Sequence, residues 1–212
     1  MVVNLVGGPL PITGPRRQAG RCTPAAGPRG RRERLLAAAA ELFAERGYHS
    51  VTLAEIGGAV GISGPGVYRH FKSKESLLGE LLVDVSRHLL ASARDRVASA
   101  VGPLDALARL VDFHAGFAVV NPALITVQAR ELSSLAPEAQ RRVRRLQRTY
   151  VGVWAGTIAK AALFERPEEA TAAAHAVFGL LNSTPFSARL DGQRMRALLA
   201  SMALGALTGS GR

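Results

Sequence analysis

The side chains best suited to chemistry are clustered between Ser63 and Lys74, in the sequence SGPGVYRHFKSK. Within it, Tyr68, Arg69 and His70 follow one another, and each can donate a hydrogen bond to a phosphate oxygen or to the edge of a base. The segment also carries two lysines. This pattern is typical of binding to a polyanion by hydrogen bonds and charge neutralisation.

Residues suited to catalysis or metal binding form no familiar pattern along the chain. There is no Ser-His-Asp order, no metal-ligand spacing, no phosphate-binding loop and no dinucleotide fingerprint. We therefore expect a protein that is not an enzyme and that uses no metal or other cofactor.

Two short helices separated by a tight turn are predicted to position the polar cluster. Thr52 and Glu55 have the spacing of a capping box, which predicts that a helix begins at Leu53. Gly61 is placed to end that helix, because glycine adopts the left-handed conformation of a tight turn without steric cost. Ser63 then predicts the cap of the next helix. This order of helix, turn and helix indicates a helix-turn-helix.

The segment 51–78, with Tyr68-Arg69-His70-Phe71-Lys72-Ser73-Lys74-Glu75 inside it, resembles the DNA-binding domain of the tetracycline-repressor (TetR) family of bacterial transcription regulators. The resemblance is specific over about residues 31–90 and covers only the general plan beyond them. It implies a homodimeric repressor that binds a palindromic operator in double-stranded DNA and is released by a small-molecule effector. It also implies phosphate contacts from Tyr68, His70 and Lys74. The candidate DNA-binding residues are Arg29, Arg31, Thr52, Ser63, Gly64, Gly66, Tyr68, Arg69, His70, Lys72 and Lys74.

Glycines shape the two predicted helices. Gly57, one turn before the turn glycine, is expected to let the helices cross closely, with Val67 and Phe71 facing inward from the second helix. Gly64 and Gly66 remove side-chain bulk from that helix. We expect them to let its backbone approach the floor of a DNA groove, which leaves recognition to the few remaining side chains and to duplex shape.

The chain carries a strong positive charge, with 27 Lys plus Arg, 16 Asp plus Glu and a formal net charge of +11. This excess favours a polyanionic partner, and ordinary solubility is the alternative. Arg29, Arg31, Arg32 and Arg34 crowd the start of the first predicted helix, 30–46, where the helix dipole disfavours cations. We expect these arginines to bind an external anion such as DNA phosphate.

Alanine and leucine dominate and β-branched alternation is scarce, so the predicted fold class is all-α. Residues 1–28 are expected to form a disordered arm, 29–76 the DNA-binding domain and 77–212 a ligand-binding and dimerisation bundle. Beyond the helix-turn-helix, helices are predicted at about 73–100, 104–120, 123–135, 137–164, 166–183 and 193–207, which makes about nine in all. The last two are rich in small and apolar residues and are expected to pair with a second subunit.

Three features indicate a cytoplasmic protein without membrane contact. Cys22 is the only cysteine, which excludes an internal disulfide and fits a reducing compartment. No apolar run approaches the roughly 18 residues of a membrane span. The N-terminus lacks the charged start and continuous apolar stretch of a signal peptide.

Polar and aromatic side chains interrupt the apolar faces of the C-terminal helices, as they do in ligand pockets between the helices of a bundle. For each histidine among them, a hydrogen-bonded position in the core is the simpler interpretation. The candidate ligand-binding residues are Phe113, His114, Phe117, Gln128, Arg142, Tyr150, Trp154, His175 and Phe178.

Five arginines lie within eight residues of the predicted helix 137–164, at positions 141, 142, 144, 145 and 148. A solvated helix face is the simpler interpretation. The alternative is that they bind the anionic end of an effector such as an acyl-coenzyme A, and Arg142, beside the apolar face, is the best placed for this.

Two other functional classes stay open at this level. One is a helical small-molecule-binding or catalytic protein whose N-terminal unit is merely structural. The other is a non-specific basic binder of nucleic acid or membrane. Competition gel shifts separate these from a regulator, because only a regulator should prefer one palindromic duplex over bulk DNA.

Overall fold

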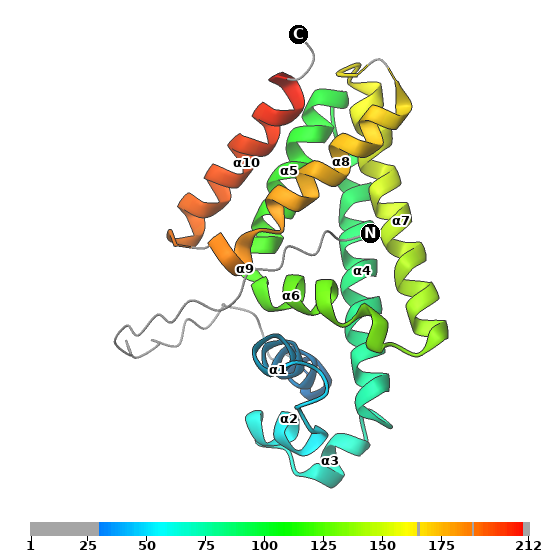
Figure 1. Cartoon of the computed structure of the whole chain (residues 1–212), viewed down its shortest axis with the longest axis vertical. Helices are drawn as coiled ribbons and strands as arrows, with labels where there is room; N and C mark the ends of the chain where they lie inside the picture. Colours follow the sequence, from blue (N-terminus) through cyan, green and yellow to red (C-terminus); the bar gives the residue numbers. More distant parts are fainter. Residues whose placement is uncertain (1–29, 165, 188, 210–212) are drawn as a thin grey trace.

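The computed structural model describes residues 30–164, 166–187 and 189–209, and these form helices and loops with no strand (Figure 1). The all-α fold class is therefore confirmed. The helices are α1 (Arg31–Arg46), α2 (Leu53–Ala59), α3 (Gly64–Tyr68), α4 (Lys74–Ala98), α5 (Pro103–Val120), α6 (Pro122–Arg130), the 3-10 turn η1 (Leu132–Ser134), α7 (Pro137–Lys160), α8 (Pro167–Leu181), α9 (Thr184–Ser187) and α10 (Gly192–Gly209).

The helices α1 to α3 lie at one end of the molecule (Figure 1). Thr52 caps α2 as predicted: the Glu55 N–H donates to Thr52 Oγ1 at 3.2 Å, and the Thr52 N–H donates to Glu55 Oε2 at 2.7 Å. Gly61 has φ of +72°, the left-handed conformation that lets the chain turn sharply into α3. The predicted helix-turn-helix is confirmed.

The crossing of α2 and α3 depends on a glycine. A Cβ atom on Gly57 would lie 2.6 Å from both the carbonyl oxygen of Ile62 and Cγ2 of Val67, which is far inside van der Waals contact. Val67 is fully buried and Phe71 is 1% exposed, so α3 is anchored by the inward face expected of it. The close approach of the two helices at Gly57 therefore fixes the orientation of α3 relative to α2.

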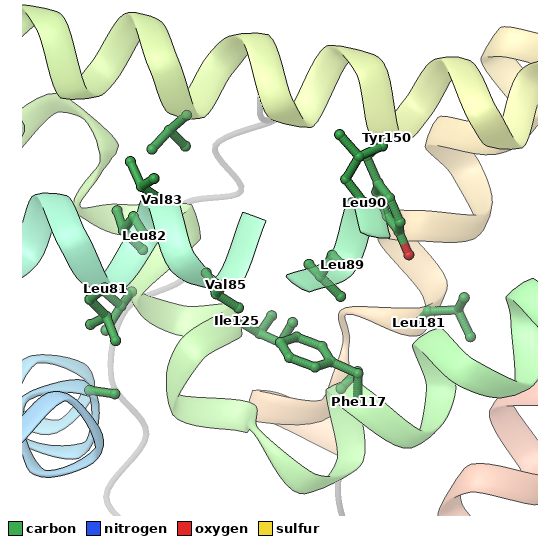
Figure 2. Packing of buried hydrophobic residues seen from close by; sticks show 14 of the residues in the cluster. Leu81, Leu82, Val83, Val85, Leu89, Leu90, Phe117, Ile125, Tyr150 and Leu181 are labelled. Atoms are coloured by element: carbon green, nitrogen blue, oxygen red, sulfur yellow. The ribbon is translucent and has the colours of Figure 1, made fainter. Parts of the chain in front are cut away.

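The long helix α4 connects the helix-turn-helix to the rest of the molecule. It packs against α1 at one end and against α5 and α7 further along. Figure 2 shows its side chains Leu82, Val83, Val85 and Leu89 pointing in several directions into one continuous core. Residues of one helix therefore belong to both halves of this core.

The predicted helix 123–135 is shorter than expected. The α-helix ends at Arg130, and the 3-10 turn η1 follows Glu131. The Ser134 N–H donates to the Glu131 carbonyl at 3.0 Å, and Ser134 Oγ donates to the Glu131 carboxylate at 3.0 Å. These short-range bonds compete with the helical pattern and tighten the chain.

Two further boundaries differ from expectation. The helix predicted to reach 164 ends at Lys160, because Ala162 has φ of +53°, which a helix cannot contain. Thr184 and Pro185 end α8 as expected but also begin the short helix α9, since proline is tolerated in the first turn of a helix. Thr184 fixes α9 by donating from Oγ1 to the Ala118 carbonyl at 2.9 Å.

Among the described residues, no single helix is long and apolar enough to cross a membrane. The helices α5 and α6 meet that test only as a pair, and they are bent by 91° where they join.

Candidate nucleic-acid interface and effector pocket

The helix α3 lies at the end of the molecule (Figure 1), and polar side chains on and around it are exposed to solvent. Tyr68 is 60% exposed although it is a large aromatic residue, and Arg69 beside it is also exposed. Ser63 precedes α3 and makes no side-chain hydrogen bond to its backbone, so its hydroxyl is available to a partner. His70 is partly buried and Lys72 is exposed. The predicted contact residues of this segment are therefore accessible together.

Three arginines line a hollow of about 410 Å³ between the start of α1 and the turn that precedes α3. They are Arg31 and Arg34 of α1 and Arg69 after α3. None of the three forms an ion pair with the other described residues. Uncompensated guanidinium groups that converge on one concave surface favour binding of an anion, and phosphate fits their planar donors.

Arg32 differs from the arginines beside it. Its guanidinium forms an ion pair with Glu80, lies 3.6 Å from the Asp84 carboxylate and stacks 5.5 Å above the Phe71 ring. Because α4 supplies counter-charges to Arg32, its contact with an external anion is not needed to balance its charge and stays a prediction. Arg29, another predicted contact residue, lies outside the described residues.

Lys74 is also engaged within the protein. Its ammonium group donates to the carbonyl oxygens of Tyr48, His49 and Val51 at 2.8, 3.2 and 2.7 Å, and it lies 4.5 Å from the centre of the Tyr48 ring. An ammonium group has three N–H donors, so none remains for a phosphate. These bonds give Lys74 a structural role, and the phosphate contact expected of it stays a prediction.

Two other predicted contact residues have roles inside the domain. The Thr52 hydroxyl is hydrogen-bonded to Glu55 in the cap of α2. A Cβ atom on Gly66 would lie 2.8 Å from Cγ2 of Ile62 and 3.3 Å from Oγ of Ser63, so this glycine also relieves crowding within the domain. A Cβ atom on Gly64 would meet nothing within 4 Å. Close approach of either glycine to a DNA groove stays a prediction.

In the C-terminal part, four predicted ligand residues form an aromatic cluster. Ring centroids of Trp154 and Phe178 are 4.8 Å apart, those of His114 and Phe178 5.1 Å, and those of Tyr150 and Phe178 5.4 Å. Figure 2 shows Tyr150 pointing from α7 toward the interior. Trp154 is fully buried, and its indole N–H has no hydrogen-bond acceptor among the described residues. Burial raises the pKa of the Tyr150 hydroxyl, and the nearby Trp154 side chain opposes this rise.

The centre of this cluster is a buried hydrogen-bonded histidine. His114 Nε2 is 3.0 Å from Asn182 Oδ1, and His114 Nδ1 is 2.8 Å from the Tyr150 hydroxyl. Because Asn182 Oδ1 can only accept, the proton is placed on Nε2, and Nδ1 accepts from Tyr150. Burial lowers the pKa of His114 to about 4, so the ring is neutral. Asn182 was not predicted, since a lone asparagine near a helix end carries no distinct sequence signal.

We expect His114 to make the folded state sensitive to acid. The ring binds a proton with a pKa near 6.5 when unfolded and about 4 when folded, so stability is fully present above about pH 6.5 and is lost as the pH falls toward 4. Between pH 7.5 and 5 the loss should be about 2 kcal/mol. Denaturant unfolding at both pH values measures it.

In that measurement, His114→Phe should remove most of the pH dependence, because phenylalanine does not titrate. His88→Ala, at an exposed histidine of α4, is the control and should keep the dependence of the natural protein. A pH dependence that survives in His114→Phe would assign it to other groups.

The remaining ligand candidates are not brought to this cluster. His175 is exposed on α8, apart from the aromatic cluster, and its contact with a ligand stays a prediction. Arg142 is exposed and lines a separate hollow of about 470 Å³ between α4 and the start of α7, beside Glu138. Gln128 is partly buried on α6, and Phe113 lies under the Arg96 guanidinium at 4.0 Å.

Phe117 lies between the cluster and the helix-turn-helix. Its ring is 6.2 Å from His114, and it also lines a hollow of about 750 Å³ between α1, α4 and the α5–α6 corner. Glu33 and Glu41 of α1 form part of the rim of this hollow. Among the described residues, no group of three or more His, Cys, Asp or Glu side chains could hold a metal ion.

Two regions that together make up most of the chain are similar to known protein families. Residues 35–81 match bacterial regulatory proteins of the tetR family, and residues 100–206 match the tetracyclin repressor-like C-terminal domain. A curated relative is the transcriptional repressor KstR2 of Mycobacterium tuberculosis H37Rv, 37% identical over 110 residues, which are 51% of this chain and 54% of KstR2. This chain therefore matches about half the length of that relative.

Solved structures extend the similarity over the whole fold. A tetR-family regulatory protein from Rhodococcus RHA1 superposes with a TM-score of 0.69 and 28% identity, over 83% of this chain and 96% of that one. The regulator FadR from Bacillus subtilis, solved in complex with stearoyl-CoA, superposes with a TM-score of 0.65 and 20% identity, over 84% and 98% of the two chains. At that identity, FadR shares the fold alone.

Proposed function

Because the chain belongs to the tetR family of bacterial regulatory proteins, we propose that it is a transcriptional repressor that binds a palindromic operator as a homodimer and is released by a small apolar effector. The DNA-binding half of the proposal is carried by three arginines beside α3 that line one hollow and form no ion pair with the other described residues. Such a surface neutralises phosphates while α3 enters the major groove. The repressor KstR2 is a curated relative of the same kind.

The dimer is proposed to form through α8 and α10. Small residues of α8 are exposed on one face, among them Ala172, Ala176 and Gly179. On α10, Leu198 is 45% exposed and Met202 is 50% exposed. A self-complementary surface of this kind allows two copies to pair around a two-fold axis and to present two α3 helices to successive major grooves.

The effector is proposed to enter the aromatic cluster around His114. The side chains there are largely aromatic, and the Trp154 indole N–H is a donor without an acceptor among the described residues. The stearoyl-CoA bound by FadR makes acyl thioesters the first class to test here. Arg142 lies eight residues before Tyr150 on α7, about 12 Å along the helix axis, so an extended ligand is long enough to reach both.

The test is to sequence the DNA that the protein retains from its own genome and then to titrate long-chain acyl-coenzyme A into the resulting complex. A regulator should retain one palindromic duplex against excess bulk DNA, and micromolar acyl-coenzyme A should release it. An effector must bind the DNA-incompetent state more tightly, since equal affinity for both states shifts nothing.

Two matched variants separate the parts of this proposal. Arg142→Ala should weaken release, whereas Arg141→Ala, at an exposed arginine of the same helix, should not. Equal release by both variants would remove Arg142 from the ligand site. No release from the natural protein would reject acyl thioesters, and no preferred duplex would reject the operator.

A further inference from the structure

The turn between α1 and α2, residues 47–52, is held by a side chain from the C-terminal half of the molecule. Glu131, directly after α6, accepts a hydrogen bond on Oε1 from the Tyr48 N–H at 3.2 Å, and its Oε2 accepts from Ser134 Oγ at 3.0 Å. Glu131 is only 8% exposed. A buried carboxylate whose partners come from two segments resists separation of those segments, because separation would leave polar groups unpaired.

The same turn is held from a second side by Lys74 at the start of α4. The three carbonyl oxygens that its ammonium group contacts belong to Tyr48, His49 and Val51, and therefore follow the turn along its whole length. Val51 immediately precedes Thr52, the capping residue of α2. The position of Lys74 thus determines where α2 begins, and α2 in turn determines where α3 lies.

Tyr48 is the point at which the two contacts meet. Its N–H is bound by a carboxylate and its carbonyl oxygen by an ammonium group. Its ring packs edge-on against Phe43 of α1 at 5.3 Å. With opposite charges on its two sides and its ring buried, Tyr48 has little freedom to move independently of α6 or α4.

We propose that Glu131 and Lys74 are positioning residues that clamp the α1–α2 turn, so that the location of the α6–η1 segment sets the orientation of the helix-turn-helix. The contacts of Glu131 and Lys74 with the turn are observed in the structure. Their effect on DNA binding rests on the proposed function, and separate experiments test the contacts and this effect.

The first experiment measures amide hydrogen exchange in the full-length protein without DNA. Glu131→Ala should speed exchange of the Tyr48 amide by about tenfold or more, because its acceptor is lost. Glu131→Gln keeps an oxygen acceptor at that position and should stay within about threefold of the natural protein. The control is Gln140→Ala, which removes a 3.0 Å hydrogen bond to the Leu132 carbonyl without touching the helix-turn-helix, and should leave Tyr48 unchanged. Unchanged Tyr48 exchange in Glu131→Ala would overturn the clamp.

The second experiment uses the salt dependence of binding to the retained duplex. Lys74→Met keeps the apolar stem over Tyr48 but removes every donor. It should weaken binding by about tenfold while the slope of log affinity against log salt stays unchanged, since no phosphate contact is lost. A slope smaller by about 0.9 would show that Lys74 neutralises a phosphate directly, and would overturn its positioning role.

The third experiment tests the link in the opposite direction. If the contact couples the two segments, binding of the retained duplex must slow amide exchange at residues 131–134, since coupling between two sites is reciprocal. This protection should disappear in Glu131→Ala. Duplex binding that leaves these amides unchanged in the natural protein would overturn the link. If no duplex binds at all, the proposed function fails, and the first experiment still decides whether the clamp exists.

Discussion

Replacing Gly57 with alanine should abolish operator binding and destabilise the helix-turn-helix, because the crossing of α2 and α3 leaves no room for a Cβ atom. The added carbon would lie 2.6 Å from the carbonyl oxygen of Ile62 and from Cγ2 of Val67. A backbone carbonyl cannot rotate away as a flexible side chain does, so α3 must shift relative to α2. Such overpacking costs about 1–3 kcal/mol. Denaturant unfolding and gel shifts with the retained duplex measure the two effects.

The neighbouring Gly58 provides the matched control. It lies in the same helix, and a Cβ atom there would meet nothing within 4 Å. Gly58→Ala should therefore bind the duplex normally and gain up to about 1 kcal/mol of stability, because alanine favours the helix over glycine. If both variants bound DNA equally well, the close crossing would have no role in recognition.

Replacing Arg31, Arg34 and Arg69 together with alanine should remove most of the affinity for DNA and make the remainder less sensitive to salt. The three guanidinium groups line one hollow and lack ion-pair partners among the described residues, so each can neutralise a phosphate. Each phosphate contact contributes about 0.9 to the slope of log affinity against log salt, so the triple variant should lose up to about 2.7. Fluorescence anisotropy over a range of salt concentrations measures this slope.

A triple variant elsewhere on the surface controls for net charge. Arg144, Arg145 and Arg148 are exposed on α7, and their replacement by alanine removes the same total charge. That variant should keep nearly the whole slope, because its charges act on DNA only at a distance and are screened by salt. Equal losses in both triple variants would mean that overall charge, rather than this hollow, binds DNA.

The polar groups of the interface divide into those that are exposed and those that are engaged within the protein. Tyr68 and Arg69 are exposed on and after α3 as expected. Lys74 and Arg32 belong to the same basic stretches, yet both are paired inside the protein. A lysine that binds phosphate and one that binds carbonyl oxygens look alike in a sequence, because the difference lies in residues far along the chain.

The C-terminal cluster shows the same division. Of the ligand candidates, Tyr150 and Trp154 lie four residues apart and are buried on α7, whereas His175 lies on an exposed face of α8. Small residues surround His175 on α8, so its neighbours in sequence do not distinguish an interior face from an exposed one. Arg142 adjoins an apolar face but lines a groove beside α4, away from the rings.

By itself, the sequence determined the all-α class and the helix-turn-helix. The cap of α2 joins Thr52 to Glu55, three residues away, and the turn depends on the conformational freedom of Gly61, so both are settled by near neighbours. Only the tertiary structure decided which polar groups remain free. The carbonyl oxygens that hold Lys74 lie 23 to 26 residues away, and Glu131 lies 83 residues from Tyr48. Such pairings form when distant helices pack together, and the local spacing of residues carries no information about which helices will meet.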